Sequence, residues 1–266
     1  MSRTPYSGSL SCCAWALSGS EAETLQYLHG LGLRAMDVRP GGLHSAAALA
    51  QRDALGLEVC CVAASHELPE EAALDSTDDR AVASARLHIE DAITHAASLG
   101  AGFAYIVPDA PVDDRSLHRY ANLLPQLADH GARHGVRLGI EHFPGTAMPT
   151  VASTLAFLQW VQHPNLYLLF DIGHAQMSNE DPRAALEAAG SRLGYVHLDD
   201  NDGVEDLHLA LTDGVQTRAS LEDLFAVLDD VGYAGPVSLE MKNDLPDPAD
   251  AIRRSYEILR ELTGDR

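Results

Sequence analysis

The chain has 266 residues, 46% of them hydrophobic, and a formal net charge of −21 at pH 7. Such a chain can bury the core of one domain spanning residues 1–266, and its charge argues against a nucleic-acid partner, because phosphate contacts need Lys and Arg. No apolar stretch reaches the roughly 18 residues of a membrane span, and the start, Met1 to Tyr6, lacks a signal-peptide pattern, so we expect a cytoplasmic protein without a membrane partner.

Apolar and amphipathic runs alternate along the chain, and many amphipathic runs close on a glycine, as at Leu55-Gly56. The apolar runs predict strands near 9–16, 33–39, 57–64, 101–107, 136–142, 166–172, 193–199 and 236–242. We expect a helix after each strand, including Glu21–Leu31, Arg80–Leu99, Ser116–His134, Thr150–Val161, Pro182–Ala189, Leu221–Val231 and Pro248–Leu262. Ser220 is the expected N-cap before Leu221, and Asp181 and Asp247 are expected N-caps before a proline.

Strand and helix units repeated in this way predict an α/β fold, a single (β/α)8 TIM barrel. An open doubly wound sheet is the alternative fold. It would need a glycine-rich phosphate loop after the first strand, and the segment from Trp15 to Ser20 matches such a loop poorly. The barrel is therefore the predicted fold.

The cysteines form two adjacent pairs, Cys12-Cys13 and Cys60-Cys61, within the first and third predicted strands. Adjacent residues of a strand point to opposite faces of the sheet. The pairs also lack the spacing of a CxxC redox motif. We therefore expect reduced cysteines in the core.

Several predicted strands end on side chains that can bind metals: Glu141, Asp171, His197 and Glu240. Any one of them could be an N-cap or a solvated loop residue. However, the carboxyl ends of barrel strands meet at one mouth, and carboxylates that converge there need a cation or a base between them. The mostly oxygen donor set predicts one divalent cation, with Mn²⁺ favoured and Mg²⁺, Co²⁺ or Zn²⁺ as alternatives.

With these residues the chain resembles the xylose isomerase-like TIM-barrel superfamily, whose sugar isomerases and epimerases are related in fold to the zinc AP endonucleases. The likeness is carried by Gly139-Ile140-Glu141, Phe170-Asp171-Ile172-Gly173-His174, Val196-His197-Leu198-Asp199-Asp200-Asn201, Asp206-Leu207-His208 and Val237-Ser238-Leu239-Glu240. The resemblance implies that Glu141, Asp171, His197 and Glu240 bind one divalent cation. It also implies that Glu141 and Glu240 are the catalytic acid and base and that His174 contacts the substrate.

This ligand set indicates proton transfer next to a carbonyl group. A cation that binds the carbonyl oxygen and the neighbouring hydroxyl of a sugar stabilises the enediolate that forms when the intervening carbon loses its proton. Glu141 or Glu240 takes that proton, and either it or the other glutamate returns it. We therefore predict a divalent-metal-dependent isomerase or epimerase acting on an unphosphorylated sugar or keto-sugar.

Other functions stay open. A lyase or dehydratase acting on a keto-sugar, keto-inositol or 3-keto-glycoside would begin with the same proton abstraction, and Lys242, the only lysine, could then protonate the leaving group. A non-catalytic carbohydrate-binding barrel is a third candidate. The endonuclease branch is disfavoured, because His66 could supply one of its two earlier histidine ligands, but the end of strand 4, Ile106-Val107-Pro108-Asp109, offers no histidine for the other.

Substrate contacts are expected from residues around the same mouth: His174, His208, Trp15, Arg39, His66 and Lys242. Each of the residues that follow a strand could equally be an ordinary loop residue. Lys242 shares the strand parity of Glu240, so it should point into the mouth, whereas His142, next to Glu141, should point away. Similar ketohexose epimerases carry an Arg in the segment that here reads Asp199 to Gly203, and its absence argues against phosphorylated substrates. The oligomeric state is open, with a homo-oligomer as one candidate.

Overall fold

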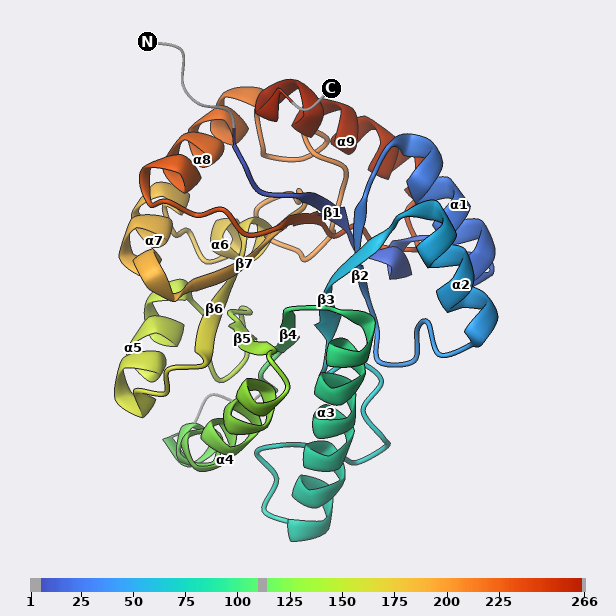
Figure 1. Ribbon diagram of the computed structural model, residues 1–266. Helices are drawn as coiled ribbons and strands as arrows, with labels where there is room; N and C mark the ends of the chain where they lie inside the picture. The colour runs from blue at the N-terminus through green and yellow to red at the C-terminus, as the bar shows by residue number, and fades with distance from the viewer. Residues whose placement is uncertain (1–5, 110–113, 265–266) are drawn as a thin grey trace.

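The computed structural model describes residues 6–109 and 114–264. An 8-stranded parallel sheet runs in the order β1-β8-β7-β6-β5-β4-β3-β2, so strands that are neighbours in the sequence are also neighbours in space. The sheet curls into a barrel with the helices arranged around its outside (Figure 1). The prediction of a TIM barrel is confirmed.

The strands are β1 (Leu10–Cys12), β2 (Ala35–Val38), β3 (Glu58–Ala63), β4 (Phe103–Ile106), β5 (Arg137–Glu141), β6 (Leu166–Asp171), β7 (Leu193–Leu198) and β8 (Val237–Leu239). The helices are α1 (Glu21–Leu31), α2 (Ala46–Leu55), α3 (Asp79–Leu99), α4 (Asp114–Arg133), α5 (Val151–Val161), α6 (Ile172–Met177), α7 (Pro182–Ala189), α8 (Arg218–Asp230) and α9 (Pro248–Thr263). Strands β1 and β8 are shorter than predicted. After β1 the chain turns into a 3₁₀ helix over Ala14–Ala16, which ends the extended run early.

Side-chain caps set the helix starts. Thr217 caps α8, because its hydroxyl accepts the backbone N–H of Ser220 at 3.1 Å while the Ser220 hydroxyl accepts the N–H of Thr217 at 2.9 Å. The prediction of Ser220 as the N-cap was therefore wrong, and α8 begins before Leu221. Asp181 and Asp247 cap α7 and α9 ahead of a proline, as predicted.

The inside of the barrel is filled at the end opposite the mouth. Phe103, in β4, packs there against Tyr195, with ring centroids 5.1 Å apart. Gly139 and Gly194 make room for it, since a Cβ at either position would collide with the Phe103 ring. The guanidinium of Arg137 covers the same ring at 5.4 Å. These side chains fill the part of the barrel interior that lies away from the carboxyl ends of the strands.

The barrel closes where β1 meets β2. Cys13, directly after β1, is joined to Asp37 of β2 by an isolated parallel bridge. All four cysteines are free, as predicted, although Cys60 is only partly buried. No helix within residues 6–109 and 114–264 is long and apolar enough to cross a membrane.

Candidate metal centre and active-site cavity

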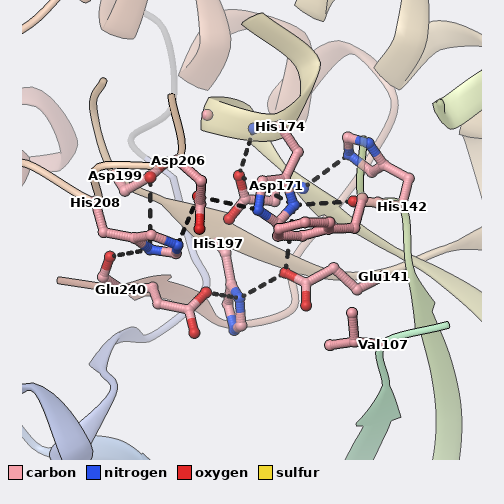
Figure 2. Close-up of polar contacts among 12 residues, drawn as sticks. Val107, Glu141, His142, Asp171, His174, His197, Asp199, Asp206, His208 and Glu240 are labelled. Carbon is pink, nitrogen blue, oxygen red and sulfur yellow. Dashed lines mark hydrogen bonds and ion pairs between the residues drawn. The ribbon is translucent and has the colours of Figure 1, made fainter. Parts of the chain in front are cut away.

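Four strands bring the expected metal-binding side chains together. Glu141 and Asp171 are the last residues of β5 and β6, His197 lies in β7, and Glu240 follows β8 directly. All are buried, and one ligand atom from each lies within 4.8 Å of the others. Figure 2 shows the ring of His197 between Glu141 and Glu240. The structure thus has a buried Glu/Asp/His cluster consistent with a divalent metal site.

The donor atoms of this cluster fit a cation. Glu141 Oε1, Asp171 Oδ2 and both ring nitrogens of His197 are buried and have no hydrogen-bond partner among the described residues. His197 Nδ1 lies 3.5 Å from Glu141 Oε1 and 2.7 Å from Glu240 Oε2. Buried polar atoms normally have partners, and leaving them without one is costly. A cation shared by these oxygens and one nitrogen would satisfy them together.

Protons balance the charge of the cluster in the cation-free protein. Burial raises the pKa of Glu141, and the nearby Glu240 raises it further. Burial alone would lower the pKa of His197, but the carboxylates of Glu240, Asp37 and Glu141 outweigh it and raise that pKa well above its usual value. The pKa of Glu240 is lowered, because His197 outweighs the effect of burial. A bound cation would take the place of these protons.

The short helix α6 places His174 beside the cluster. Asp171 Oδ1 accepts the backbone N–H of His174 at 2.8 Å and caps this helix, which was not predicted from the sequence. His174 Nδ1 donates to the backbone carbonyl of His142 at 2.9 Å. His142 lies behind Asp171, whose backbone N–H it accepts at 3.2 Å, so it points away from the cavity as expected.

Asp206 bridges two histidines above the metal cluster (Figure 2). Its Oδ1 lies 2.8 Å from His208 Nε2 and 3.4 Å from His174 Nε2. Each ring directs Nδ1 at a backbone carbonyl, His208 at that of Glu240 at 2.8 Å, so in a neutral ring Nε2 would be an acceptor facing an acceptor. Despite burial, Asp171 and then Asp206 raise the pKa of His174 to about 10, and Asp206 and then Asp199 raise that of His208 to about 11. Both rings are therefore cationic hydrogen-bond donors at neutral pH.

A cavity of about 380 Å³ opens above the cluster. Glu141 and Glu240 reach its lining, whereas Asp171 and His197 lie beneath. All the residues expected to contact substrate also line it: Trp15, Arg39, His66, His174, His208 and Lys242. Trp15 is flanked by His66, at 5.5 Å between ring centroids, and by the Arg39 guanidinium at 5.7 Å. The volume is at the small end for ligand pockets and suits a monosaccharide.

The reason given for Lys242 was wrong, although its position was right. Strand β8 ends at Leu239, so strand parity does not orient Lys242. The loop is held instead by a hydrogen bond from the Lys242 backbone N–H to the carbonyl of His208 at 3.3 Å. The Lys242 ammonium lies 3.4 Å from Asp206 Oδ2. This contact brings the ammonium to the cavity.

Two buried aspartates were not singled out from the sequence. Asp199, just after β7, is fully buried against Gly173, where a Cβ would collide with its carboxylate. Burial and the nearby Asp171 raise the pKa of Asp199 well above its usual value. Asp37 lies inside the barrel, 3.6 Å from His197 Nε2. The sequence feature that could have identified Asp37 is a carboxylate in the middle of an apolar strand.

The chain matches a known protein family over most of its length. A family described as xylose isomerase-like TIM barrel matches residues 17–262. An inosose dehydratase from Erwinia tasmaniensis is 32% identical over 158 residues, 52% of this chain and 53% of that protein. An L-ribulose 3-epimerase from Methylomonas sp. is 32% identical over 129 residues, 47% of this chain and 42% of that protein. The chain thus matches about half the length of these curated relatives.

A solved structure shows the same fold. It is the crystal structure of a D-allulose 3-epimerase from Methylomonas sp. in complex with D-allulose. The TM-score is 0.80 at 18% sequence identity, and the alignment covers 97% of this chain and 98% of that one. At this identity the likeness concerns the fold alone.

Proposed function

Because this chain belongs to the xylose isomerase-like TIM barrel family, we propose that it is a divalent-metal-dependent epimerase or isomerase of an unphosphorylated sugar or keto-sugar. The observation that carries the proposal is the placement of Glu141 and Glu240. Both line the cavity, and they lie on either side of His197 in one buried cluster (Figure 2). Two carboxylates at one cavity floor are what a two-sided proton transfer requires.

Glu141, Asp171, His197 and Glu240 are the proposed ligands of one cation, with Mn²⁺ as the first choice for so many oxygen donors. When bound, the cation would polarise a carbonyl of the sugar and make the adjacent C–H more acidic. Asp171 and His197 lie beneath the cavity and would hold the cation from below. Glu141 and Glu240 reach the cavity and would contact both cation and substrate.

The glutamates would move the proton. One of them takes it from the carbon next to the carbonyl. Its return to the opposite face of the same carbon by the other glutamate gives an epimer, and its return to the neighbouring carbon gives an isomer. His174 and His208 line the cavity with Nε2 facing Asp206, and a substrate oxygen would take the place of Asp206 as the acceptor of one of these Nε2–H groups.

The remaining cavity residues support a neutral sugar as substrate. Trp15 offers an aromatic face for stacking on a sugar ring. Among the described lining residues, the cationic side chains of Arg39, Lys242, His174 and His208 are matched in number by four carboxylates: Asp109, Glu141, Asp206 and Glu240. Because the carboxylates offset these cations, the cavity has no excess of positive charge to favour a phosphorylated substrate.

A dehydratase is the second candidate, and Lys242 is the observation that favours it. Its ammonium reaches the cavity beside Asp206 and could protonate a departing hydroxyl. The likeness to an inosose dehydratase over about half the chain supports the same alternative. In this reaction the first proton would again be removed by Glu141 or Glu240.

Incubation with a panel of ketohexoses, inososes and 3-keto-glucosides tests the proposal. With Mn²⁺ present, at least one unphosphorylated sugar should be converted, and a chelator or Glu141→Gln should stop the conversion. Asp244→Ala, which removes an exposed acid from the loop after β8, is the matched control and should stay active. Tight sugar binding without any conversion would instead indicate a non-catalytic carbohydrate-binding barrel.

A further inference from the structure

We propose that Asp37 is a positioning residue for the metal centre: its buried carboxylate holds His197 with the proton on Nε2, so that Nδ1 is free to bind the cation. The inference rests on the metal ligands of the proposed function. It concerns a residue inside the barrel that does not line the cavity.

The register of β2 turns Asp37 into the barrel. Its neighbours Met36 and Val38 belong to the core cluster between the barrel and the helices, so strand alternation directs Asp37 the other way. The pairing of β2 with β3 shifts register between Met36 and Asp37, an irregularity of the kind that re-aims a side chain near an active site. The bridge to Cys13 fixes the backbone at this point.

The two oxygens of Asp37 have different partners. Oδ1 accepts hydrogen bonds from the hydroxyls of Ser11, at 3.0 Å, and Tyr195, at 2.6 Å. Oδ2 lies 3.8 Å from the Cys13 thiol and 3.6 Å from His197 Nε2. Among the described residues in these contacts, only His197 can carry a positive charge. A fully buried carboxylate in this position therefore has His197 as its electrostatic partner.

The opposite side of the His197 ring faces the metal cluster. Nδ1 lies toward Glu141 and Glu240, so the ring has carboxylates at both nitrogens. A neutral imidazole has one N–H and one lone pair. If Nδ1 is to bind a cation, the proton must be on Nε2, and the carboxylate of Asp37 is the group that stabilises it there.

The separation of 3.6 Å is a few tenths of an ångström longer than a normal hydrogen bond. In the cation-free protein Glu240 holds the other nitrogen at 2.7 Å. Coordination of Glu240 to a cation would weaken that attraction and let the ring approach Asp37. The arrangement matches the carboxylate–histidine–metal pattern, in which the second carboxylate orients the ligand without touching the metal.

A purely structural role for Asp37 is the competing explanation, since Oδ1 ties β2 to β1 and β7 through Ser11 and Tyr195. The two roles use different oxygens and can be separated. Ser11→Ala and Tyr195→Phe each remove a hydrogen bond to Oδ1 and leave Oδ2 facing His197. Asp37→Asn keeps the shape of the side chain and removes its charge.

Titration of the full-length protein with Mn²⁺, followed by the electron paramagnetic resonance signal of the free ion, measures the cation affinity of each variant. We expect Asp37→Asn to bind Mn²⁺ about 10–100-fold more weakly than wild type, the usual cost of losing a residue that orients a metal ligand. Ser11→Ala and Tyr195→Phe should lower the melting temperature but keep the affinity within about threefold.

Equal losses of affinity in all three variants would mean a structural role and overturn the proposal, as would unchanged affinity in Asp37→Asn. A wild-type protein without affinity for Mn²⁺ would overturn the proposed metal site, and this inference with it. Nitrogen-15 NMR of the Zn²⁺-loaded wild type gives a test that needs no variant. The proposal requires a Nε2–H proton on His197, and coordination of Zn²⁺ through Nε2 would contradict it.

Discussion

Glu240 Oε2 lies 2.7 Å from His197 Nδ1, at the distance of a hydrogen bond, yet Nδ1 has no aligned hydrogen-bond partner among the described residues. Each of these two residues also offers a ligand atom within 4.8 Å of ligand atoms from Glu141 and Asp171. A carboxylate oxygen and an imidazole nitrogen that lie this close without an aligned hydrogen bond are well placed to bind the same third group. A divalent cation is the partner that this donor set favours.

Asp171→Asn should remove bound metal while leaving the fold intact. The amide oxygen can still accept the N–H of His174 and cap α6, whereas Asp171→Ala would also lose the cap, worth about 1 kcal/mol. The loss of a direct ligand should exceed the roughly 10–100-fold cost of losing a supporting residue. Elemental analysis of protein purified without chelator measures the bound metal in each variant. Equal metal content in wild type, Asp171→Asn and Asp171→Ala would rule out the site as drawn.

Mn²⁺ affinity should rise with pH. In the cation-free protein the pKa values of His197 and Glu141 are raised, so both tend to hold protons that a cation must displace. Each proton released makes affinity rise about tenfold per pH unit until the group is deprotonated in the cation-free state. Calorimetry in two buffers with different ionisation enthalpies counts the protons. Binding that releases none, with a flat pH profile, would contradict this charge balance.

Lys242→Arg should separate the role of the proton on Lys242 from that of its charge. Arg keeps the positive charge and the attraction to Asp206, but it cannot donate a proton at neutral pH. If Lys242 is a general acid, kcat should fall by about 10²–10⁴-fold. Because the Lys242 side chain is 38% exposed, Lys242→Arg should not disturb folding, and an unchanged melting temperature of the variant checks this. Full activity of Lys242→Arg would show that Lys242 is not an acid.

Abasic DNA should not bind measurably at physiological salt. The net charge of −21 repels a polyanion, and phosphate contacts need cationic side chains. Incubation of a labelled abasic duplex with the Mn²⁺-loaded and the Zn²⁺-loaded protein checks this. Strand incision that a chelator abolishes would make a nuclease the leading function.

The barrel and the metal cluster could be predicted because both depend on patterns along single strands. An apolar run that closes on Glu141, Asp171 or His197 shows which side chain lies near the end of its strand, and parallel strands then bring those ends together. The order of the strands in the sheet follows from the alternation of strand and helix.

The surrounding residues depend on contacts between distant segments, which a pattern within one strand does not reveal. The position of Asp37 depends on its bridge to Cys13 and on the register shift between β2 and β3, both of which involve another segment of the chain. Helix α6 has 6 residues, too few for an amphipathic period to appear. Lys242 reaches the cavity through a loop hydrogen bond to His208, so its correct placement from strand parity was coincidental.

The central claim is that Glu141 and Glu240 exchange a proton with a carbon atom of a sugar, and proton exchange in heavy water tests it most directly. Wild type with Mn²⁺ and a substrate found in the panel should place deuterium on carbon, because the abstracted proton mixes with solvent before it returns. An epimerase or isomerase gives a product of otherwise unchanged mass, whereas a dehydratase product lacks the mass of water.

Mass spectrometry of recovered substrate and product gives the decisive measurement. Glu141→Gln and Glu240→Gln should each slow carbon deuteration by about 10²–10⁴-fold, while Asp244→Ala should not. Conversion of the sugar at wild-type rate in either Gln variant, or turnover by wild type without any exchange at carbon and without loss of a leaving group, would contradict the account.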